Sequence, residues 1–138
     1  MSTPSPTAPD RAIRAGGWHR WLVASRPRTL TMAITPVVVG ASLAWAEGAD
    51  ANWPVFMLTL ACAVLIQAGT NLLNDVTDYE KGNDRADRVG PLRITAAGWA
   101  TPSEVRRVAR DSFRHLVACV VEILHLEAEE KRRGLEGI

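Results

Sequence analysis

The sequence predicts an all-α membrane helical bundle, of which this chain holds two transmembrane helices and one amphipathic helix. Two long runs lack any charged residue, Leu30–Ala46 and Trp53–Leu73, and the second is long enough to cross a bilayer. A strong helix start follows at Thr101. The overall composition, 47% hydrophobic and 22% charged, hides this uneven distribution. A net charge of +1 gives no electrostatic footprint for nucleic acid, which we exclude as a partner.

The first residues differ in composition from the rest, and we divide the chain into three parts. Residues 1–20 are expected to be a disordered basic leader, since the first ten are rich in Ser, Thr and Pro. Residues 21–110 form the membrane portion, and residues 111–138 a polar helical tail. Basic residues interleaved with Trp18 and Trp21 across positions 11–28 predict a short helix at a membrane surface. A solvated basic tail is the alternative for this segment.

The first apolar run is marginal in length for a membrane span. As a helix, its residues extend about 25 Å, against about 30 Å of hydrocarbon. Pro36 lies inside the run, which a transmembrane helix tolerates where it packs against neighbours. The alternative is a secretory signal, in which Ala44-Trp45-Ala46 would be the cleavage site. The long preceding basic segment and the second apolar run disfavour that alternative.

The second run and the distribution of arginine predict the topology. Trp53–Leu73 extends about 31 Å as a helix. Five arginines precede the first run, the Glu47–Asn52 link has no Lys or Arg, and many basic residues follow the second run. The positive-inside rule therefore places the N-terminus and the segment after the second run in the cytoplasm. We expect a multi-pass protein of the cell membrane, in contact with the lipid bilayer.

The remainder of the chain is predicted to be a loop followed by a third helix. Gly82, Gly90-Pro91 and Gly98 are turn signals within residues 75–101. Thr101, Pro102 and Glu104 form a capping-box sequence, from which a helix should run to about residue 133. Its uncharged stretch is too short to predict a third span. The two cysteines are far apart in sequence and are interpreted as small buried hydrophobes.

The end of the second run carries a polar stripe. On a helix, four side chains fall on one face at spacings of three, four and seven residues: Asn71, Asn74, Asp75 and Asp78. Carboxylate and amide oxygens suit Mg²⁺, which also binds substrate phosphates. Cationic side chains that could hold phosphate oxygens follow: Lys81, Arg85, Arg88 and Arg93. The alternative is a helix that simply ends in polar residues at the membrane interface.

Several sequence strings together resemble one protein family. They are Arg26-Pro27-Arg28-Thr29-Leu30, Gln67-x-Gly69-Thr70-Asn71-Leu72-x-Asn74-Asp75, Asp78-Tyr79-x-Lys81-Gly82-x-Asp84 and Arg88-x-Gly90-Pro91-x-Arg93. The chain resembles the UbiA-type intramembrane prenyltransferases over roughly residues 20–110. It is most similar to the branch that acts on 1,4-dihydroxy-2-naphthoate in menaquinone biosynthesis.

The resemblance implies a bundle of about nine spans whose cavity holds Mg²⁺ and a polyprenyl diphosphate. Ionisation of that donor gives an allylic cation, which the ring of 1,4-dihydroxy-2-naphthoate attacks. By position, Asp75 and Asp78 would be the catalytic and metal-binding pair, with Asn71 as a further metal ligand. The residues implied for diphosphate binding are Asn71, Asn74, Lys81, Arg88 and Arg93. Asp84 and Asp87 are further metal candidates, because Gly82 stands where many members carry another aspartate.

The resemblance stops near residue 110, where the family continues with further apolar spans. The second aspartate-rich motif of the family does not follow, and we expect this chain to be a truncated or frame-shifted form. Two alternatives remain open at this point. One is a related prenyltransferase that uses a 4-hydroxybenzoate or homogentisate ring. The other is a small non-catalytic membrane protein that binds a partner through the helix at 103–133.

Overall fold

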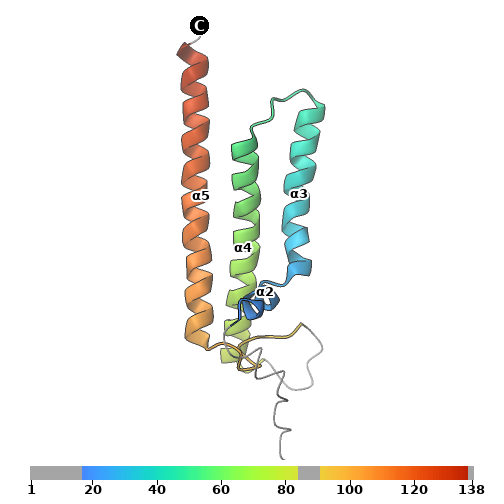
Figure 1. Ribbon diagram of the computed structural model, residues 1–138, viewed down its shortest axis with the longest axis vertical. Coiled ribbons are helices and arrows are strands. Elements are labelled where there is room, and N and C mark those ends of the chain that lie inside the picture. Colours follow the sequence, from blue (N-terminus) through green and yellow to red (C-terminus); the bar gives the residue numbers. More distant parts are fainter. Residues whose placement is uncertain (1–16, 84–90, 137–138) are drawn as a thin grey trace, which may run out of the picture.

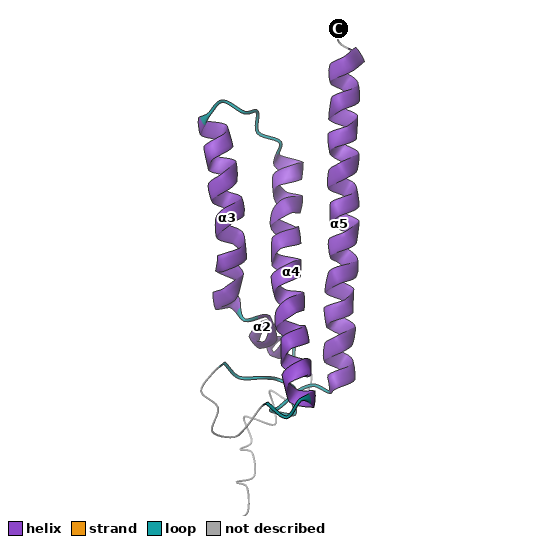
Figure 2. Cartoon of the chain, turned by 180° about the vertical axis from the view of Figure 1, so that it is seen from behind, coloured by secondary structure: helices purple, strands orange, loops and turns teal. Residues whose placement is uncertain are grey.

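The computed structural model describes residues 17–83 and 91–136, and these ranges contain helices and no strand (Figures 1 and 2). The predicted all-helical class is confirmed. Four helices follow one another along the chain: α2 His19–Ser25, α3 Pro27–Ala46, α4 Trp53–Glu80 and α5 Pro102–Glu136. The three long helices lie side by side, and the short α2 lies across the end at which α3 begins and α4 ends (Figure 1).

Helices α3 and α4 form an antiparallel hairpin, and both are long and apolar enough to cross a membrane. Helix α3 begins at Pro27 rather than at Leu30, since proline suits the first helical position. Helix α4 continues to Glu80, so the prediction that a loop begins at residue 75 is wrong. Neither Gly nor Pro occurs between residue 75 and Gly82, where φ is +68° and the chain turns.

The α3–α4 hairpin exposes large apolar side chains. No residue of α3 is buried, and Met32, Val39 and Leu43 are among its exposed side chains. Apolar exposure along a whole helix is the pattern expected of a surface that contacts hydrocarbon rather than water. This is the feature of the described chain that agrees with the predicted lipid contact.

The end of the hairpin remote from α2 is closed by aromatic packing. The ring of Trp45 lies 5.1 Å from that of Trp53 and 5.3 Å from that of Phe56. Asn52 caps α4, because its side-chain oxygen accepts the Val55 N–H at 3.2 Å. Aromatic rings at the end of an apolar helix are typical of a membrane–water interface.

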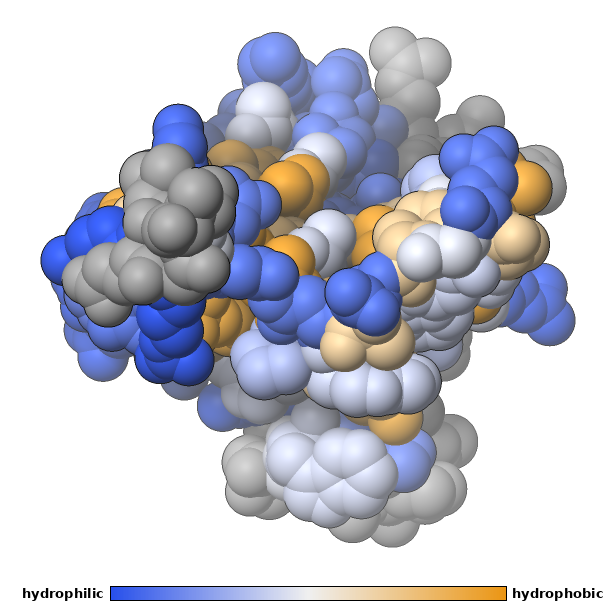
Figure 3. All heavy atoms as spheres, turned by 90° about the horizontal axis from the view of Figure 1, so that it is seen from above, coloured by the Kyte–Doolittle hydropathy of each residue, from blue (hydrophilic) through white to orange (hydrophobic). Residues whose placement is uncertain are grey.

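Helix α5 packs antiparallel along α4 (Figure 2). It starts with the predicted capping box: Glu104 Oε2 accepts the Thr101 N–H at 2.7 Å, and Thr101 Oγ1 accepts the Glu104 N–H at 3.3 Å. Helix α5 ends at Glu136, slightly beyond the predicted position. Among the described helices only α3 and α4 qualify as candidate spans, and hydrophilic residues gather over the end of α5 (Figure 3).

Gly69 is the point of close approach between α4 and α5. A Cβ added there would lie 3.0 Å from Cζ of Phe113, which is tighter than nearly all real Cβ contacts, so the Phe113 ring would have to move by a few tenths of an ångström. We expect Gly69→Ala to lower the free energy of unfolding by about 1–3 kcal/mol, because the close contact overpacks the interface. Denaturant titration in detergent micelles measures this change. Gly40→Ala is the matched control, since no atom lies within 4 Å of the added Cβ, and an equal loss in both variants would contradict the packing.

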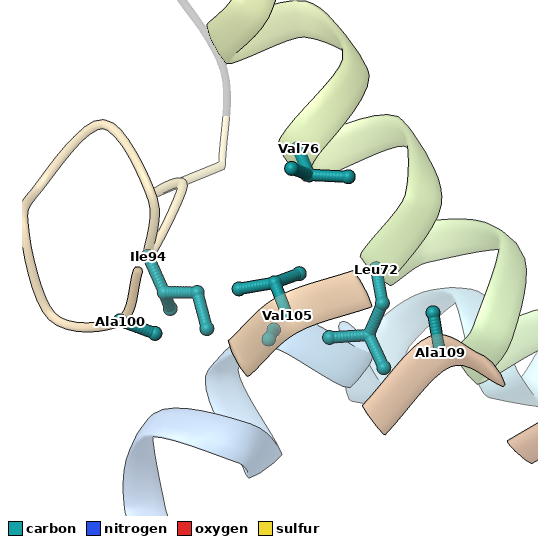
Figure 4. Packing of buried hydrophobic residues seen from close by; sticks show 7 residues of the cluster. Leu72, Val76, Ile94, Ala100, Val105 and Ala109 are labelled. Carbon is teal, nitrogen blue, oxygen red and sulfur yellow. The ribbon is translucent and has the colours of Figure 1, made fainter. Parts of the chain in front are cut away.

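The buried apolar core lies at the end of the molecule where α4 finishes and α5 begins. Leu72 and Val76 of α4 face Val105 and Ala109 of α5, and Ile94 of the connecting loop packs into the same cluster (Figure 4). Ile94, Val105 and Ala109 are fully buried. The core therefore fixes the loop against the last turns of α4, where the predicted polar stripe lies.

Candidate functional site

Asn71 lies where the polar stripe meets the corner between α2 and α3. Its amide nitrogen donates to the Ser25 carbonyl and to Thr29 Oγ1, both at 2.8 Å. Its side-chain oxygen accepts from Gln67 at 3.3 Å, and the residue is only 4% exposed. At this corner Arg26 adopts a left-handed conformation with φ of 54°, which is uncommon outside glycine. Asn71 therefore joins α4 to the α2–α3 corner.

Asp75 is the most deeply buried charged residue of the described chain, with 1% of its surface exposed. Oδ2 accepts the Ile94 N–H at 3.0 Å, and Oδ1 accepts the Thr95 N–H at 3.1 Å. Hydrogen bonds from backbone amides to a carboxylate are stronger than hydrogen bonds between neutral groups. Asp75 thus attaches the loop to α4 through both of its oxygens.

Arg93 connects the loop to the next turn of α4. Its Nη1 donates to the Asn74 carbonyl at 2.7 Å, and its Nη2 forms an ion pair with Asp78. The Arg93 side chain is 7% exposed, and that of Asp78 is 30% exposed. Asn83 makes a long 3.5 Å contact to the same carboxylate. The Arg93 guanidinium is therefore a cation that the protein itself places against Asp78.

The remaining predicted site residues are not brought into this network. The Asn74 side chain is exposed, although its carbonyl accepts from Arg93. Lys81 is exposed at the end of α4. Arg88, Asp84 and Asp87 lie outside the described residues, as does Arg85. Of the predicted set, the structure brings together Asn71, Asp75, Asp78 and Arg93.

Sequence reasoning missed the residues that attach α2 to the loop. Arg20 Nη1 donates to the Trp99 carbonyl at 2.9 Å, and Nη2 lies 3.7 Å from Glu104. The Thr101 N–H and hydroxyl, which donate to Glu104, hold the pKa of that carboxyl below its usual value. Thr95 Oγ1 is buried in this region and has no hydrogen-bond partner among the described residues. No local pattern relates Arg20 to a carbonyl 79 residues away.

A pocket of about 700 Å³ opens beside this network, next to the beginning of α3. It is lined by Val23, Arg26, Pro27, Arg28, Thr29, Pro91 and Leu92. Thr29 is shared with the network, since its hydroxyl accepts from Asn71. The lining combines two arginines with mainly apolar side chains, a combination that suits a ligand with an anionic head and an apolar tail.

The described carboxylates do not form a divalent metal site in the arrangement seen. Both Asp75 oxygens are engaged by backbone amides, and Asp78 already has the Arg93 guanidinium as its cation. The described part of the chain holds no group of three or more Asp, Glu, His or Cys side chains arranged for a metal ion. A divalent ion would need a different arrangement around Asp78.

The comparison with known proteins identifies one family. Residues 33–110 match the UbiA prenyltransferase family. The matched region includes α4 with its polar stripe and the beginning of α5, and it ends at residue 110 within α5.

Curated relatives include several proteins with one name. The chain is 42% identical over 87 residues to 1,4-dihydroxy-2-naphthoate octaprenyltransferase of Escherichia coli (strain K12), covering 63% of this chain and 28% of that protein. It is 43% identical over 95 residues to the protein of that name from Mycobacterium tuberculosis, covering 68% and 32%. The Bacillus subtilis protein of that name is 36% identical over 107 residues, covering 78% and 33%.

The matches cover only part of these relatives. The chain spans about 30% of the length of the curated proteins it matches. No solved structure matches it.

Proposed function

Because this chain belongs to the UbiA prenyltransferase family, we propose that it carries the first aspartate motif of an enzyme that transfers a polyprenyl group from its diphosphate to 1,4-dihydroxy-2-naphthoate. In this reaction the allylic C–O bond breaks and the diphosphate leaves with the electron pair. A ring carbon of the acceptor then forms the new C–C bond, and the carboxylate leaves as CO₂ while its bonding electron pair stays with the ring. The acceptor is inferred from the relatives named for it.

The observation that carries the proposal is the position of the charged network at one end of two apolar helices. The ion pair of Asp78 with the loop residue Arg93 lies at the last turns of α4, and Arg26 and Arg28 line the pocket beside α3. A prenyl diphosphate has a strongly anionic head and a long apolar tail. The arginines would hold the head by charge-assisted hydrogen bonds, while the exposed apolar surface of α3 would accept the tail.

The proposal includes a location in the cell membrane with the network on the cytoplasmic side. The arginine distribution supports this orientation, since basic residues precede α3 and follow α4 and none occurs in residues 47–52. Prenyl chains partition into the bilayer, whereas a diphosphate stays in water. A site at the end of the spans would allow both parts of the donor to remain in a suitable environment.

The family is the reason for including Mg²⁺ in the proposal. In the described arrangement the carboxylates of Asp75 and Asp78 have other partners. Three described residues would contribute to binding the diphosphate or its counter-ion: Asp78, Lys81 and Arg93. Asn71 and Asp75 would act through the positions they give to α2, α3 and the loop.

The test is prenyl transfer in membranes that contain this chain. Membranes are supplied with a polyprenyl diphosphate, 1,4-dihydroxy-2-naphthoate and Mg²⁺, and the prenylated product is measured by mass spectrometry. We expect any product formed with the unaltered chain to fall at least about 100-fold in Asp78→Asn, because the variant lacks the charge that faces Arg93.

Glu80→Gln is the matched control, since Glu80 lies in the same last turn of α4 but pairs with Arg106 of α5. It should retain activity within a few-fold. Product with 4-hydroxybenzoate or homogentisate in place of the naphthoate would overturn the assigned acceptor. No product with any acceptor would show that the chain does not catalyse the reaction by itself, and it would favour a non-catalytic membrane role.

A further inference from the structure

We propose that Cys62 of α4 and Cys119 of α5 form a redox-active thiol pair, which a lipid-soluble disulfide converts into a covalent link between the two helices. Both cysteines are free thiols. They lie far apart in sequence, and the antiparallel packing of α4 and α5 brings them together. The proposed modification site lies outside the charged network, and it does not depend on prenyl transfer.

The register of α4 against α5 is fixed by contacts on either side of the two cysteines. Toward the end of α4, Gly69 lies against the ring of Phe113. At the start of α4, the Asn52 amide donates to the Glu130 carboxylate at 2.9 Å. Antiparallel helices have the same rise of about 1.5 Å per residue. Counting along both helices from either contact therefore leads to one level of the pair, and that level holds the two cysteines.

Both thiols face the contact between the helices. Cys62 is buried, and Cys119 is half-buried, whereas the side chain of the next residue, Val120, is 43% exposed. The thiol of Cys119 is a side-chain hydrogen-bond partner of the Cys62 thiol. A disulfide requires two cysteines whose side chains are directed at each other. The register and the burial of the two side chains meet this requirement.

The surroundings of the pair determine which class of oxidant can reach it. Cys62 lies near the middle of the charge-free run Trp53–Leu73, and Cys119 lies within the uncharged stretch Leu116–Val121. Helix α4 is long and apolar enough to cross a membrane. A charged oxidant would have to lose its hydration to enter such a region, which is unfavourable. We therefore infer a neutral, apolar disulfide as the co-reactant.

The reaction is two successive thiol–disulfide exchanges. One cysteine sulfur attacks a sulfur of the apolar disulfide, the S–S bond of that disulfide breaks, and the first reagent thiol leaves with the proton of the attacking thiol. The other cysteine sulfur then attacks the protein-bound sulfur and releases the second reagent thiol, which takes the second proton. Two cysteines are oxidised and one disulfide is reduced. The second exchange is favoured because the helices already hold the two sulfurs side by side.

The experiment treats the purified full chain in micelles with 4,4′-dithiodipyridine, a neutral aromatic disulfide whose released thiol is measured by its absorbance. We expect release of two reagent thiols per chain and an intact mass lowered by two hydrogen atoms. Proteolysis should then yield one peptide pair joined through Cys62 and Cys119. A chain that carries two reagent groups, a link between two chains, or no reaction would each overturn the proposal.

The matched control moves one thiol by a single position. Cys119→Ala combined with Val120→Cys keeps two thiols in the chain but places the second at an exposed position of α5. We expect this variant to form the internal link at least about tenfold more slowly, because its sulfurs are not held together. An equal rate would overturn the proposal, since chance encounters rather than helix packing would then explain the link.

A charged reagent tests the inferred class of oxidant. The dianionic disulfide 5,5′-dithiobis(2-nitrobenzoate) should react with the unaltered chain at least about tenfold more slowly than the neutral reagent, because its charges keep it in water. Equal rates with the two reagents would overturn the assignment of an apolar co-reactant.

The link is expected to hold α5 against α4. It closes residues 62–119 into one covalent loop, which reduces the conformational entropy of the unfolded chain. The oxidised chain should therefore unfold at a higher denaturant concentration than the reduced chain, and dithiothreitol should reverse the shift. An unchanged midpoint would contradict this role. None of these measurements uses a prenyl substrate, so a failure of the proposed function would leave them unaffected.

Discussion

Asp75→Ala is expected to release the loop from α4 and to lower the free energy of unfolding by about 3–5 kcal/mol. The substitution removes two charge-assisted hydrogen bonds and leaves the buried Ile94 and Thr95 amides without partners, each at a cost of about 1–3 kcal/mol. Hydrogen exchange read out by mass spectrometry or NMR in micelles checks this directly. The amides of Ile94 and Thr95 should be protected in the unaltered chain and should exchange rapidly in the variant.

Two further variants separate this effect from a general loss of charge. Asp75→Asn keeps one acceptor oxygen but presents an NH₂ group to the second amide, so we expect an intermediate loss of protection. Glu80→Ala removes an exposed carboxylate from the same helix and should change stability by less than about 1 kcal/mol. Protection of both amides in Asp75→Ala would mean that the apolar core alone holds the loop.

The features that sequence predicted well are those set by neighbours in the chain. The Thr101–Glu104 capping box depends on a spacing of three residues, and both of its hydrogen bonds are present. The two apolar helices follow from runs without charge, which are equally local. The polar residues before Gly82 indicate a loop by their composition, but they are compatible with a helix, and α4 continues through them to Glu80.

The partners of the site residues could not be predicted in the same way. The helical spacing placed Asn71, Asp75 and Asp78 on one face, which is how they lie in α4. Spacing does not tell which backbone amides a carboxylate accepts after a loop returns, and the Asp75 partners are about 20 residues further along. Arg93 was predicted from its charge to face a phosphate, yet its described partner is Asp78. A resemblance to a family indicates which residue types belong to the site. It does not indicate which group each side chain contacts in the folded chain.

Asn71→Ala is expected to loosen the α2–α3 corner while leaving the loop attached. It removes the two 2.8 Å hydrogen bonds to the Ser25 carbonyl and the Thr29 hydroxyl, for an expected loss of about 2–3 kcal/mol in the free energy of unfolding. Denaturant titration in micelles measures the loss. Asn74→Ala is the matched control one turn along α4, because its side chain is exposed, and it should change stability by about 0.5 kcal/mol or less.

The two attachments of α4 can be distinguished by the amides that each protects. In Asn71→Ala the Thr29 amide, which donates to the Arg26 carbonyl at 2.8 Å, should exchange faster, while Ile94 and Thr95 stay protected. In Asp75→Ala the opposite pattern is expected. If each variant exposes both sets of amides, the corner and the loop unfold as one unit. If each variant exposes only its own set of amides, Asn71 determines the position of the pocket arginines and Asp75 determines the position of Arg93. The α2–α3 corner and the loop could then change position separately.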